Sequence, residues 1–467
     1  MPEYKPTIGL EVHAELKTRT KMFCDSLNDP DEKHPNVNVC PVCLGHPGTL
    51  PVANKQAIEH VIRVGLALGG KINETTKFDR KNYFYPDLPK GYQISQYDKP
   101  LVEGGILKNI RIRRVHLEED TGTLAHADGA SLVDYNRSGM PLMELVTEPD
   151  FRNADEVVDF ARELQLILRY LGASTADMEK GQMRIEANVS LNMGAYVELK
   201  NINSFRAVHD AVEYELKRQE EALASDEVLK KETRGWDEVK RKTIVQRSKE
   251  DAHDYRYFPE PDLPPFETSV FGLDAIRDLL PELPAAKRNR FAKEYGLDKK
   301  QVEILIGEPL IANFFEEAVS ELKEQLPGAS PVALYNYLTS DLRGLMNQAG
   351  SGFADLKTTP EHLAHLAAFI EEKKVTSRQA KDILAKMFET GVDPEEIVKS
   401  ENIGVSSDMG EIEAVVIAVI AENESAAADY KKGKVASLQF LIGQAMKKLK
   451  GRARPEMLKE IFEKSLS

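Results

Sequence analysis

A histidine and three acidic residues stand together in the stretch His116-Leu117-Glu118-Glu119-Asp120-Thr121-Gly122. The residues just before it, 110–115, alternate between apolar and basic side chains, which is typical of a β-strand. No lysine stands among the acids, whereas the charge runs of solvated helix faces usually mix both signs. Clustered carboxylates at the end of a strand suit a hard cation such as Mg²⁺, which takes oxygen ligands and bridges to phosphates. An acidic turn at a strand end explains this stretch equally well when it is taken alone.

A second polar cluster, Glu11-Val12-His13-Ala14-Glu15, alternates in the same way. In a β-strand the two glutamates and the histidine share one face of the sheet. An amphipathic strand that only supports a core would not carry such a set of side chains. The second cluster therefore favours the metal-binding interpretation of the first.

Two further stretches, 184–190 and 196–203, predict a pair of strands with polar side chains on one alternating face. A sheet with one hydrated face explains any single strand of this kind. Four strands with matching polar faces are harder to explain in that way. The side chains in question are Arg184, Glu186 and Asn188 on the first strand and Glu198 and Lys200 on the second.

The length and composition of the chain predict a multidomain globular protein. A chain of 467 residues is expected to form two to four domains, and an apolar content of 42% excludes a disordered protein. No stretch approaches the roughly 20 apolar residues of a membrane span, and the N-terminus is no signal peptide. Three cysteines argue against a disulfide scaffold. We therefore expect a soluble, cytoplasmic protein with no membrane partner.

Strand-like and helix-like segments mix irregularly up to about residue 290. We predict one helix over 154–171, capped by Asn153 and ended by Gly172, and another over 204–224, capped by Ser204. Because regular βαβ alternation is missing, we predict an α+β fold with a mixed or antiparallel sheet.

Beyond about residue 290 the periodicity is helical. The breakers Pro327-Gly328 and Pro331 and the loops near Gly350–Gly352 and Gly404–Ser407 divide this half into short helices. We expect three domains, namely a sheet-containing domain over 1–290, an all-α domain over 291–409 and a small α-helical tail domain over 410–467.

Charge is unevenly distributed along the chain. The whole chain carries a net charge of −14, yet the segment 431–467 contains ten Lys or Arg residues and three Glu, which leaves +7. A basic segment on an acidic body suits a nucleic-acid-binding protein, since only the docking face must be positive. A solvated helical face is the alternative.

The stretch from Gly65 to Ile72 is similar to a phosphate-binding P-loop but lacks the Ser or Thr that follows the lysine. The residues before it, 57–64, have helical rather than strand periodicity. We therefore read Gly69-Gly70 as the end of a helix and reject a P-loop.

Cys40-Pro41-Val42-Cys43, with Cys24 upstream, is similar to a zinc knuckle over 24–43 that lacks one ligand. A zinc ion held by the three cysteines with His34, Asp25 or water is one interpretation. An empty site with free thiols is the other.

Cations and aromatic residues are interleaved over 77–85 and 91–96. Such runs stack nucleobases and contact phosphates. A buried aromatic hairpin accounts for the rings, but it does not account for three cations within five residues, Lys77, Arg80 and Lys81.

Six segments resemble the GatB/GatE family, which provides the B-subunit of the tRNA-dependent glutamyl/aspartyl-tRNA amidotransferases. They follow the family's order along nearly the whole chain: 8–16, 77–85, 116–122, 198–205, 254–262 and 443–447. The resemblance implies a catalytic domain similar to glutamine synthetase, followed by a helical domain and a tail domain that bind tRNA.

The resemblance also implies a function. Members of this family use ATP to phosphorylate the side-chain carboxylate of misacylated Glu-tRNA(Gln) or Asp-tRNA(Asn). Ammonia from the amidase (A) subunit then displaces the phosphate, in a heterotrimer completed by a small (C) subunit. The implied cofactors are ATP and Mg²⁺, with structural Zn²⁺ in some members. A non-catalytic protein for tRNA binding or assembly is the alternative function.

The resemblance assigns roles to particular residues. Catalytic roles fall to Glu11, His13, Glu119 and Glu198. The Mg²⁺ ligands would be Glu11, His13, Glu118, Glu119 and Glu198, together with Glu186, where the family usually has an aspartate. Phosphate contacts are expected from Lys77, Arg80, Lys81 and Arg184. Zinc-binding members have a fourth cysteine two residues after the first, where this chain has Ser26.

Overall fold

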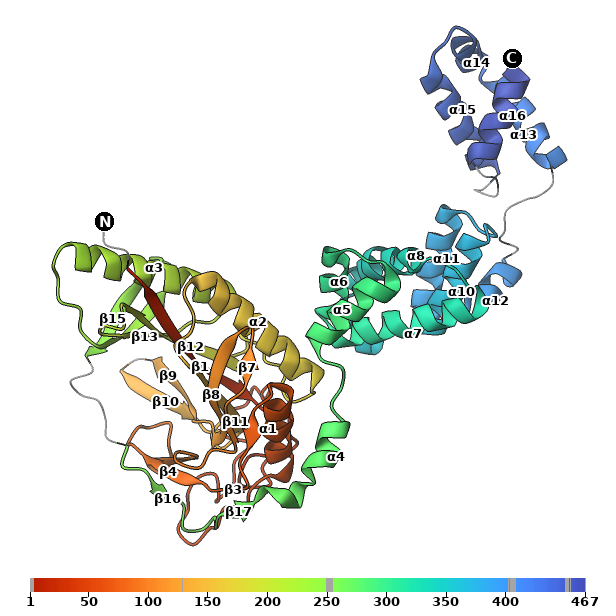
Figure 1. The fold of residues 1–467 in the computed structure, drawn as a ribbon. Helices are drawn as coiled ribbons and strands as arrows, with labels where there is room; N and C mark the ends of the chain where they lie inside the picture. The colour runs from red at the N-terminus through yellow and green to blue at the C-terminus, as the bar shows by residue number, and fades with distance from the viewer. Residues whose placement is uncertain are drawn as a thin grey trace. The chain divides into compact units, whose positions relative to one another are not determined.

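The computed structural model describes residues 4–127, 129–248, 255–401, 403, 409–449, 453 and 455–466 (Figure 1). The chain forms two compact units, Met1–Pro284 and Ala285–Ser467. The boundary between them lies close to the change from strands to helices expected near residue 290.

A ten-stranded sheet organises the first unit, with strand order β15-β14-β13-β12-β1-β11-β8-β6-β2 and β7 paired to β8. Only the β13–β14 pair is parallel among its described pairs, so the sheet is mixed, as expected. Its strands are β1 (Pro6–Glu15), β2 (Lys71–Ile72), β6 (Val102–Glu103), β7 (Ile106–Leu107), β8 (Ile110–Glu119), β11 (Pro141–Thr147), β12 (Met183–Leu191), β13 (Val197–Lys200), β14 (Glu232–Asp237) and β15 (Lys242–Ser248).

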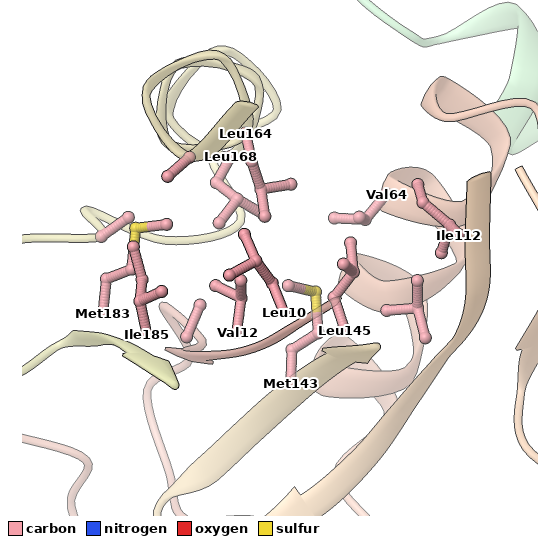
Figure 2. Packing of buried hydrophobic residues seen from close by; sticks show 14 of the residues in the cluster. Leu10, Val12, Val64, Ile112, Met143, Leu145, Leu164, Leu168, Met183 and Ile185 are labelled. Carbon is pink, nitrogen blue, oxygen red and sulfur yellow. The ribbon is translucent and has the colours of Figure 1, made fainter. Parts of the chain in front are cut away.

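The two faces of this sheet differ because its central strands alternate. In β1, Leu10, Val12 and Ala14 are buried on one face, while Glu11, His13 and Glu15 share the other. The apolar face packs against helices α1 (Lys55–Ala67) and α2 (Ala154–Tyr170). Figure 2 shows Leu164 and Leu168 of α2 over the apolar side chains of the sheet, with Val64 of α1 beside Ile112. One face is thus occupied by the core, and the polar side chains gather on the other.

The helix ends follow the local sequence. Asn153 caps α2 by accepting a hydrogen bond from the Glu156 amide, and Ser204 caps α3 (Phe205–Ala224) in the same way. Both predicted helices are therefore confirmed. α1 ends at Ala67 and is followed by Gly69 with φ +69°, so the rejection of a P-loop is confirmed as well.

Three small sheets accompany the large one. β4 (Asp79–Asn82) pairs with β5 (Tyr92–Ser95) and with β16 (Phe258–Pro259). The other two sheets are the hairpin of β9 (Thr123–Ala127) and β10 (Ala130–Asp134), and the pair of β3 (Thr75–Thr76) with β17 (Phe266–Glu267). The 3₁₀ turn η2 (Thr268–Phe271) and helix α4 (Leu273–Asp278) lead to the end of this unit.

The secondary-structure elements described in the second unit are all helices, as expected. Pro331 begins α8 and Gly350 follows α9, so these breakers act as predicted, whereas Gly404–Ser407 lie outside the described residues. Its elements are α5 (Pro284–Tyr295), α6 (Lys299–Ile306), α7 (Pro309–Gln325), α8 (Pro331–Asn336), the π-helix η3 (Tyr337–Leu342), α9 (Arg343–Ala349), the 3₁₀ turn η4 (Phe353–Asp355), α10 (Pro360–Glu371), α11 (Ser377–Thr390), α12 (Pro394–Ser400), α13 (Met409–Glu422), α14 (Glu424–Lys431), α15 (Val435–Lys448) and α16 (Pro455–Leu466).

The last four helices have a hydrophobic core of their own, which runs from Ile412 to Leu466. Residues 410–467, expected as a separate tail domain, thus have a core of their own within the second compact unit. Within the described parts of the chain, no helix combines the length and the apolar character that a membrane span requires.

Candidate active site

Four ionisable side chains form a row across the polar face of the large sheet. The strand register places His116 of β8 opposite Glu144 of β11, Glu144 opposite His13 of β1, and His13 opposite Arg184 of β12. The Cβ atoms of directly opposite residues on neighbouring strands lie about 5 Å apart. The register, rather than proximity in the sequence, therefore assembles this part of the site.

The first carboxylate–histidine triad consists of His13, Glu118 and Glu144. The His13 Nε2 atom lies 3.3 Å from Oε2 of Glu144 and 3.5 Å from Oε1 of Glu118. One potential ligand atom from each residue falls within 4.8 Å of the others. Glu118 is steadied by a hydrogen bond from the Ser95 hydroxyl at 3.2 Å.

Burial and charge set the protonation of the first triad. Burial opposes the charged form of His13, but its hydrogen bond with Glu144 and the charges of Glu144 and Glu118 raise its pKa to about 9. Burial likewise opposes the charge of Glu144, yet the neighbouring His116, His13 and Lys81 hold its pKa well below the usual range. Burial and the charge of Glu144 raise the pKa of Glu118, so the His13 imidazolium is stabilised chiefly by Glu144.

The second carboxylate triad consists of Glu11, Glu186 and Glu198, whose ligand oxygens also lie within 4.8 Å of one another. The strand register places Glu11 directly opposite Glu186. The Lys200 Nζ atom lies 2.8 Å from Oε2 of Glu186 and 3.4 Å from Oε1 of Glu198. Burial and the nearby Glu144 and Glu186 raise the pKa of Glu11. The two triads adjoin each other because Glu11 and His13 occupy alternate positions of one strand.

Glu119 takes part in neither triad, contrary to its expected role as a metal ligand beside Glu118. β8 remains extended through Glu119, and consecutive residues of a strand point to opposite faces. The Glu119 carboxylate accepts hydrogen bonds from Lys90 Nζ at 2.8 Å and from the Ile94 amide at 2.9 Å. It lines a pocket of about 110 Å³ together with Lys90, Cys24 and Cys43.

Arg184 lies at the edge of the first triad and is held by an acid. Its guanidinium donates to Oδ1 of Asp120 at 2.9 Å, and Arg137 donates to Oδ2 of the same carboxylate at 2.6 Å. Arg137 also pairs with Glu15 at 2.8 Å. Asp120 thus positions two guanidinium groups. One of them, that of Arg184, belongs to the row and lies opposite His13.

The three cations of the β4 segment have different environments. Lys77 pairs with Asp79 and Asp98 at 2.9 and 2.8 Å, and Arg80 binds Glu260 through two hydrogen bonds of 2.6 and 2.8 Å. Lys81 lies over the Tyr255 ring at 5.0 Å. Burial disfavours its charge, but Glu118, Tyr257 and Glu144 raise its pKa. Lys81 is therefore the cation of this segment that faces the first triad, whereas Lys77 and Arg80 are engaged by acids of the chain.

The sulfur atoms of Cys24, Cys40 and Cys43 lie within 4.8 Å of one another. The fully buried Lys21 places its Nζ 3.8 Å from the Cys43 Sγ and donates to the Ser138 carbonyl at 2.7 Å. Hydrogen bonding from Cys24 and the Lys21 ammonium lower the pKa of Cys43.

Neither expected protein ligand completes the cysteine set. The His34 side chain is 85% exposed and pairs with Glu32, and Asp25 is exposed. The Ser26 hydroxyl lies closer to the set, at 3.9 Å from the Cys43 Sγ. The fourth ligand of a metal ion bound by the three cysteines would therefore be Ser26 or water.

Two important residues of the site were not among the residues predicted from the sequence. Glu144 is a lone acid inside the otherwise apolar strand 141–147, and Lys200 was noted only as part of a polar strand face. A single charged residue in an apolar strand is a signal that could have identified Glu144.

Comparison with known proteins shows the family of this chain. A family model described as the GatB/GatE catalytic domain matches residues 6–270, and one described as the GatB domain matches residues 313–466. The chain belongs to the GatB/GatE family.

Full-length relatives are similar over nearly the whole chain. The B-subunit of aspartyl/glutamyl-tRNA(Asn/Gln) amidotransferase from Thermomicrobium roseum is 45% identical, and the match covers 99% of each chain. The B-subunits of the same name from Thermus thermophilus, 45% identical over 99% of each chain, and from Brevibacillus brevis, 43% identical over 100% of each chain, are similar to the same extent. The GatB/GatE catalytic domain match includes both triads and the three cysteines.

Proposed function

We propose that this chain is the ATP-dependent, amide-forming component of a tRNA-dependent amidotransferase. Its substrates would be misacylated Glu-tRNA(Gln), Asp-tRNA(Asn) or both. The observation that carries the proposal is the pair of adjoining triads on β1, His13–Glu118–Glu144 and Glu11–Glu186–Glu198. A non-catalytic tRNA-binding protein would not need to bury these ionisable groups together, since doing so costs stability.

The donor sets of both triads fit Mg²⁺, because they offer carboxylate oxygens and a single imidazole. Such a cation would supply charge neutralisation for the γ-phosphate of ATP and for the substrate carboxylate, which otherwise repel each other. His13, Glu118 and Glu144 would hold one cation, and Glu11, Glu186 and Glu198 another.

Basic side chains beside the triads would orient the anionic groups. Lys81 faces Glu118 and Glu144, and Arg184 is fixed by Asp120 next to His13. We assign both residues to the phosphate groups and to the substrate carboxylate. Lys77 and Arg80 are bound by Asp79, Asp98 and Glu260, and we assign them to the support of the β4–β5–β16 sheet.

The chemistry then proceeds in two steps. The substrate carboxylate attacks the γ-phosphate, and ADP leaves. Ammonia then attacks the acyl phosphate, so that the C–N bond forms, the C–O bond to phosphate breaks, and phosphate departs with the electron pair. A base must take the proton that the nitrogen loses. We infer that Glu119, which accepts a hydrogen bond from Lys90 at the pocket described above, takes this proton in the amide-forming step rather than binding metal.

We further propose a structural zinc ion at Cys24, Cys40 and Cys43. Three thiolates around Zn²⁺ carry a net charge of −1, which the buried Lys21 ammonium would neutralise. Ser26 or water would provide the fourth ligand.

The proposed complex is a heterotrimer of this chain, the amidase (A) subunit, which supplies ammonia, and the small (C) subunit. The helical second unit and its basic tail would bind the tRNA. The reaction belongs to protein synthesis, and we expect the complex in the cytoplasm.

A reconstituted heterotrimer tests this function. We expect ATP hydrolysis to depend on misacylated Glu-tRNA(Gln) or Asp-tRNA(Asn), and ammonium salts to replace glutamine as the nitrogen donor. Correctly charged Gln-tRNA(Gln) is the matched control, because it lacks the free carboxylate. ATP hydrolysis that ignores the acylation state of the tRNA would refute the proposal.

A further inference from the structure

The two triads differ in the basic side chain that lies closest to their carboxylates. In the first triad it is His13, which is itself a potential metal ligand. In the second triad it is Lys200, whose ammonium cannot bind a metal. The second triad therefore holds a counter-ion that a metal must displace.

The sheet fixes the position of Lys200. Glu198 and Lys200 occupy alternate positions of β13 and so project from the same face, and the Ala187–Leu199 pair sets the register with β12. Glu186 and Lys200 flank that pair on the same side, and their side chains meet at 2.8 Å. The backbone thus directs the ammonium into the second triad.

Two carboxylates of the second triad, Glu11 and Glu198, are also held by other donors. The Asn188 amide donates to Glu11 at 3.3 Å, and the Thr233 hydroxyl donates to Glu198 at 2.8 Å. These contacts use one oxygen of each carboxylate and do not depend on Lys200. Glu11 and Glu198 would therefore keep these contacts if the ammonium withdrew, whereas Glu186 would lose its contact with Lys200.

We propose that Lys200 competes with a divalent cation for Glu186 and Glu198 and so sets the metal affinity of the second triad. The inference rests on the proposed function, because it takes both triads to be metal sites. Three carboxylates carry −3, and Lys200 reduces this to −2 before any metal arrives. A metal ion that enters must displace the ammonium from shared oxygen atoms, because the two cations repel each other at contact distance.

The first triad offers a contrast within the same site. Lys81 faces Glu118 and Glu144 but forms no ion pair with them within 4 Å in the described part of the chain. The Arg114 guanidinium lies 3.9 Å from Oε1 of Glu144. A metal entering the first triad therefore has no lysine ammonium to displace from these carboxylates. Replacing Lys200 should thus change metal binding at one triad only.

The displaced ammonium needs a new anionic partner. The triad lies on the polar face of the sheet, and the Lys200 side chain is 36% exposed, so the ammonium has room to turn toward a bound anion. Lys200 is therefore a positioning residue in this proposal. Its ammonium pairs with the carboxylates of the second triad before metal binds and can contact an anionic substrate once metal is bound.

Mn²⁺ binding to the intact heterotrimer, measured by electron paramagnetic resonance without nucleotide, tests the competition. We expect Lys200→Met and Lys200→Gln to tighten Mn²⁺ binding at the second triad by about tenfold or more, as the loss of one nearby opposing charge implies. Lys200→Arg keeps the cation and should remain close to wild type. Lys240→Met, at an exposed lysine paired with Asp237, is the matched control. Adding Glu186→Gln to Lys200→Met should abolish the gain, which assigns it to the second triad.

The outcomes separate this inference from the proposed function. If two Mn²⁺ ions bind and the Lys200 variants leave both affinities unchanged, the competition is refuted while the metal sites stand. If no variant binds Mn²⁺, with or without nucleotide, the proposed metal sites fail and the competition fails with them. Thermal melting of each variant confirms that the compared proteins are folded.

Discussion

Glu144 lies directly opposite His13 across the β1–β11 pair, with its Oε2 atom 3.3 Å from the imidazole Nε2. The two residues are distant in sequence, and Glu118 joins them from a third strand. This contact defines the first triad.

The first prediction concerns this contact. We expect Glu144→Gln and His13→Ala to reduce phosphorylation of aminoacyl-tRNA by about 100-fold or more, since charge stabilisation at a metal site accounts for several kcal/mol. Glutamine hydrolysis by the amidase should partly survive. Glu148→Gln is the control, because Glu148 pairs with the half-exposed Arg113 near the end of β11. Near-normal amidation by both site variants would contradict the assignment.

Glu119 should behave differently from Glu118. Because Glu119 binds Lys90 and the Ile94 amide outside both triads, Glu119→Gln should spare ATP-dependent phosphorylation and slow amide formation. Glu118→Gln should impair both steps. Single-turnover assays that follow ADP and amidated tRNA separately distinguish the two variants. An equal loss of phosphorylation in both variants would indicate that Glu119 binds the metal, and would contradict this prediction.

The cysteine set predicts about one zinc ion per chain. Cys40→Ser should release it, and Lys21→Met should weaken its binding because the thiolate charge loses its counter-ion. Elemental analysis of the purified chain and variants measures the metal directly. A wild-type chain without zinc, together with unchanged activity of Cys40→Ser, would leave only a set of free thiols.

His116 predicts a pH dependence of stability. Burial lowers its pKa to about 4 from 6.5, so the folded chain keeps it neutral where the unfolded chain binds a proton. The free energy of unfolding is therefore unaffected by this group above pH 6.5. It decreases as the pH falls from 6.5 toward 4, by about 3 kcal/mol at most. Calorimetric melting between pH 7.5 and 4 should therefore show a shallower loss for His116→Gln than for wild type.

The basic tail predicts a tRNA contact that depends on salt. Deleting residues 410–467 should raise the KM for aminoacyl-tRNA and flatten its salt dependence, because phosphate contacts release counter-ions. Amide formation with ammonia at saturating tRNA should largely survive. Lys447 and Lys448 end α15, whereas three further cations of the basic segment 431–467, Lys450, Arg452 and Arg454, lie outside the described residues. Equal tRNA affinity with and without the tail would favour a solvated helical face.

The sequence by itself determined the local features of this protein. Strand alternation identified the shared polar face of Glu11, His13 and Glu15, and capping residues identified both long helices of the first unit. The same signals excluded a P-loop at Gly69. These predictions succeeded because each depends on contacts within a few residues along the chain.

Only the tertiary structure decided which side chains meet. The register of β1, β8 and β11 brings Glu144 to His13 and leaves Glu119 outside both triads, although Glu119 directly follows Glu118 in the chain. Register and pleat set these positions, and a shift of one residue would exchange the two faces of a strand. Pairing between distant strands is set by the packing of the whole sheet, so no pattern within one strand could reveal it.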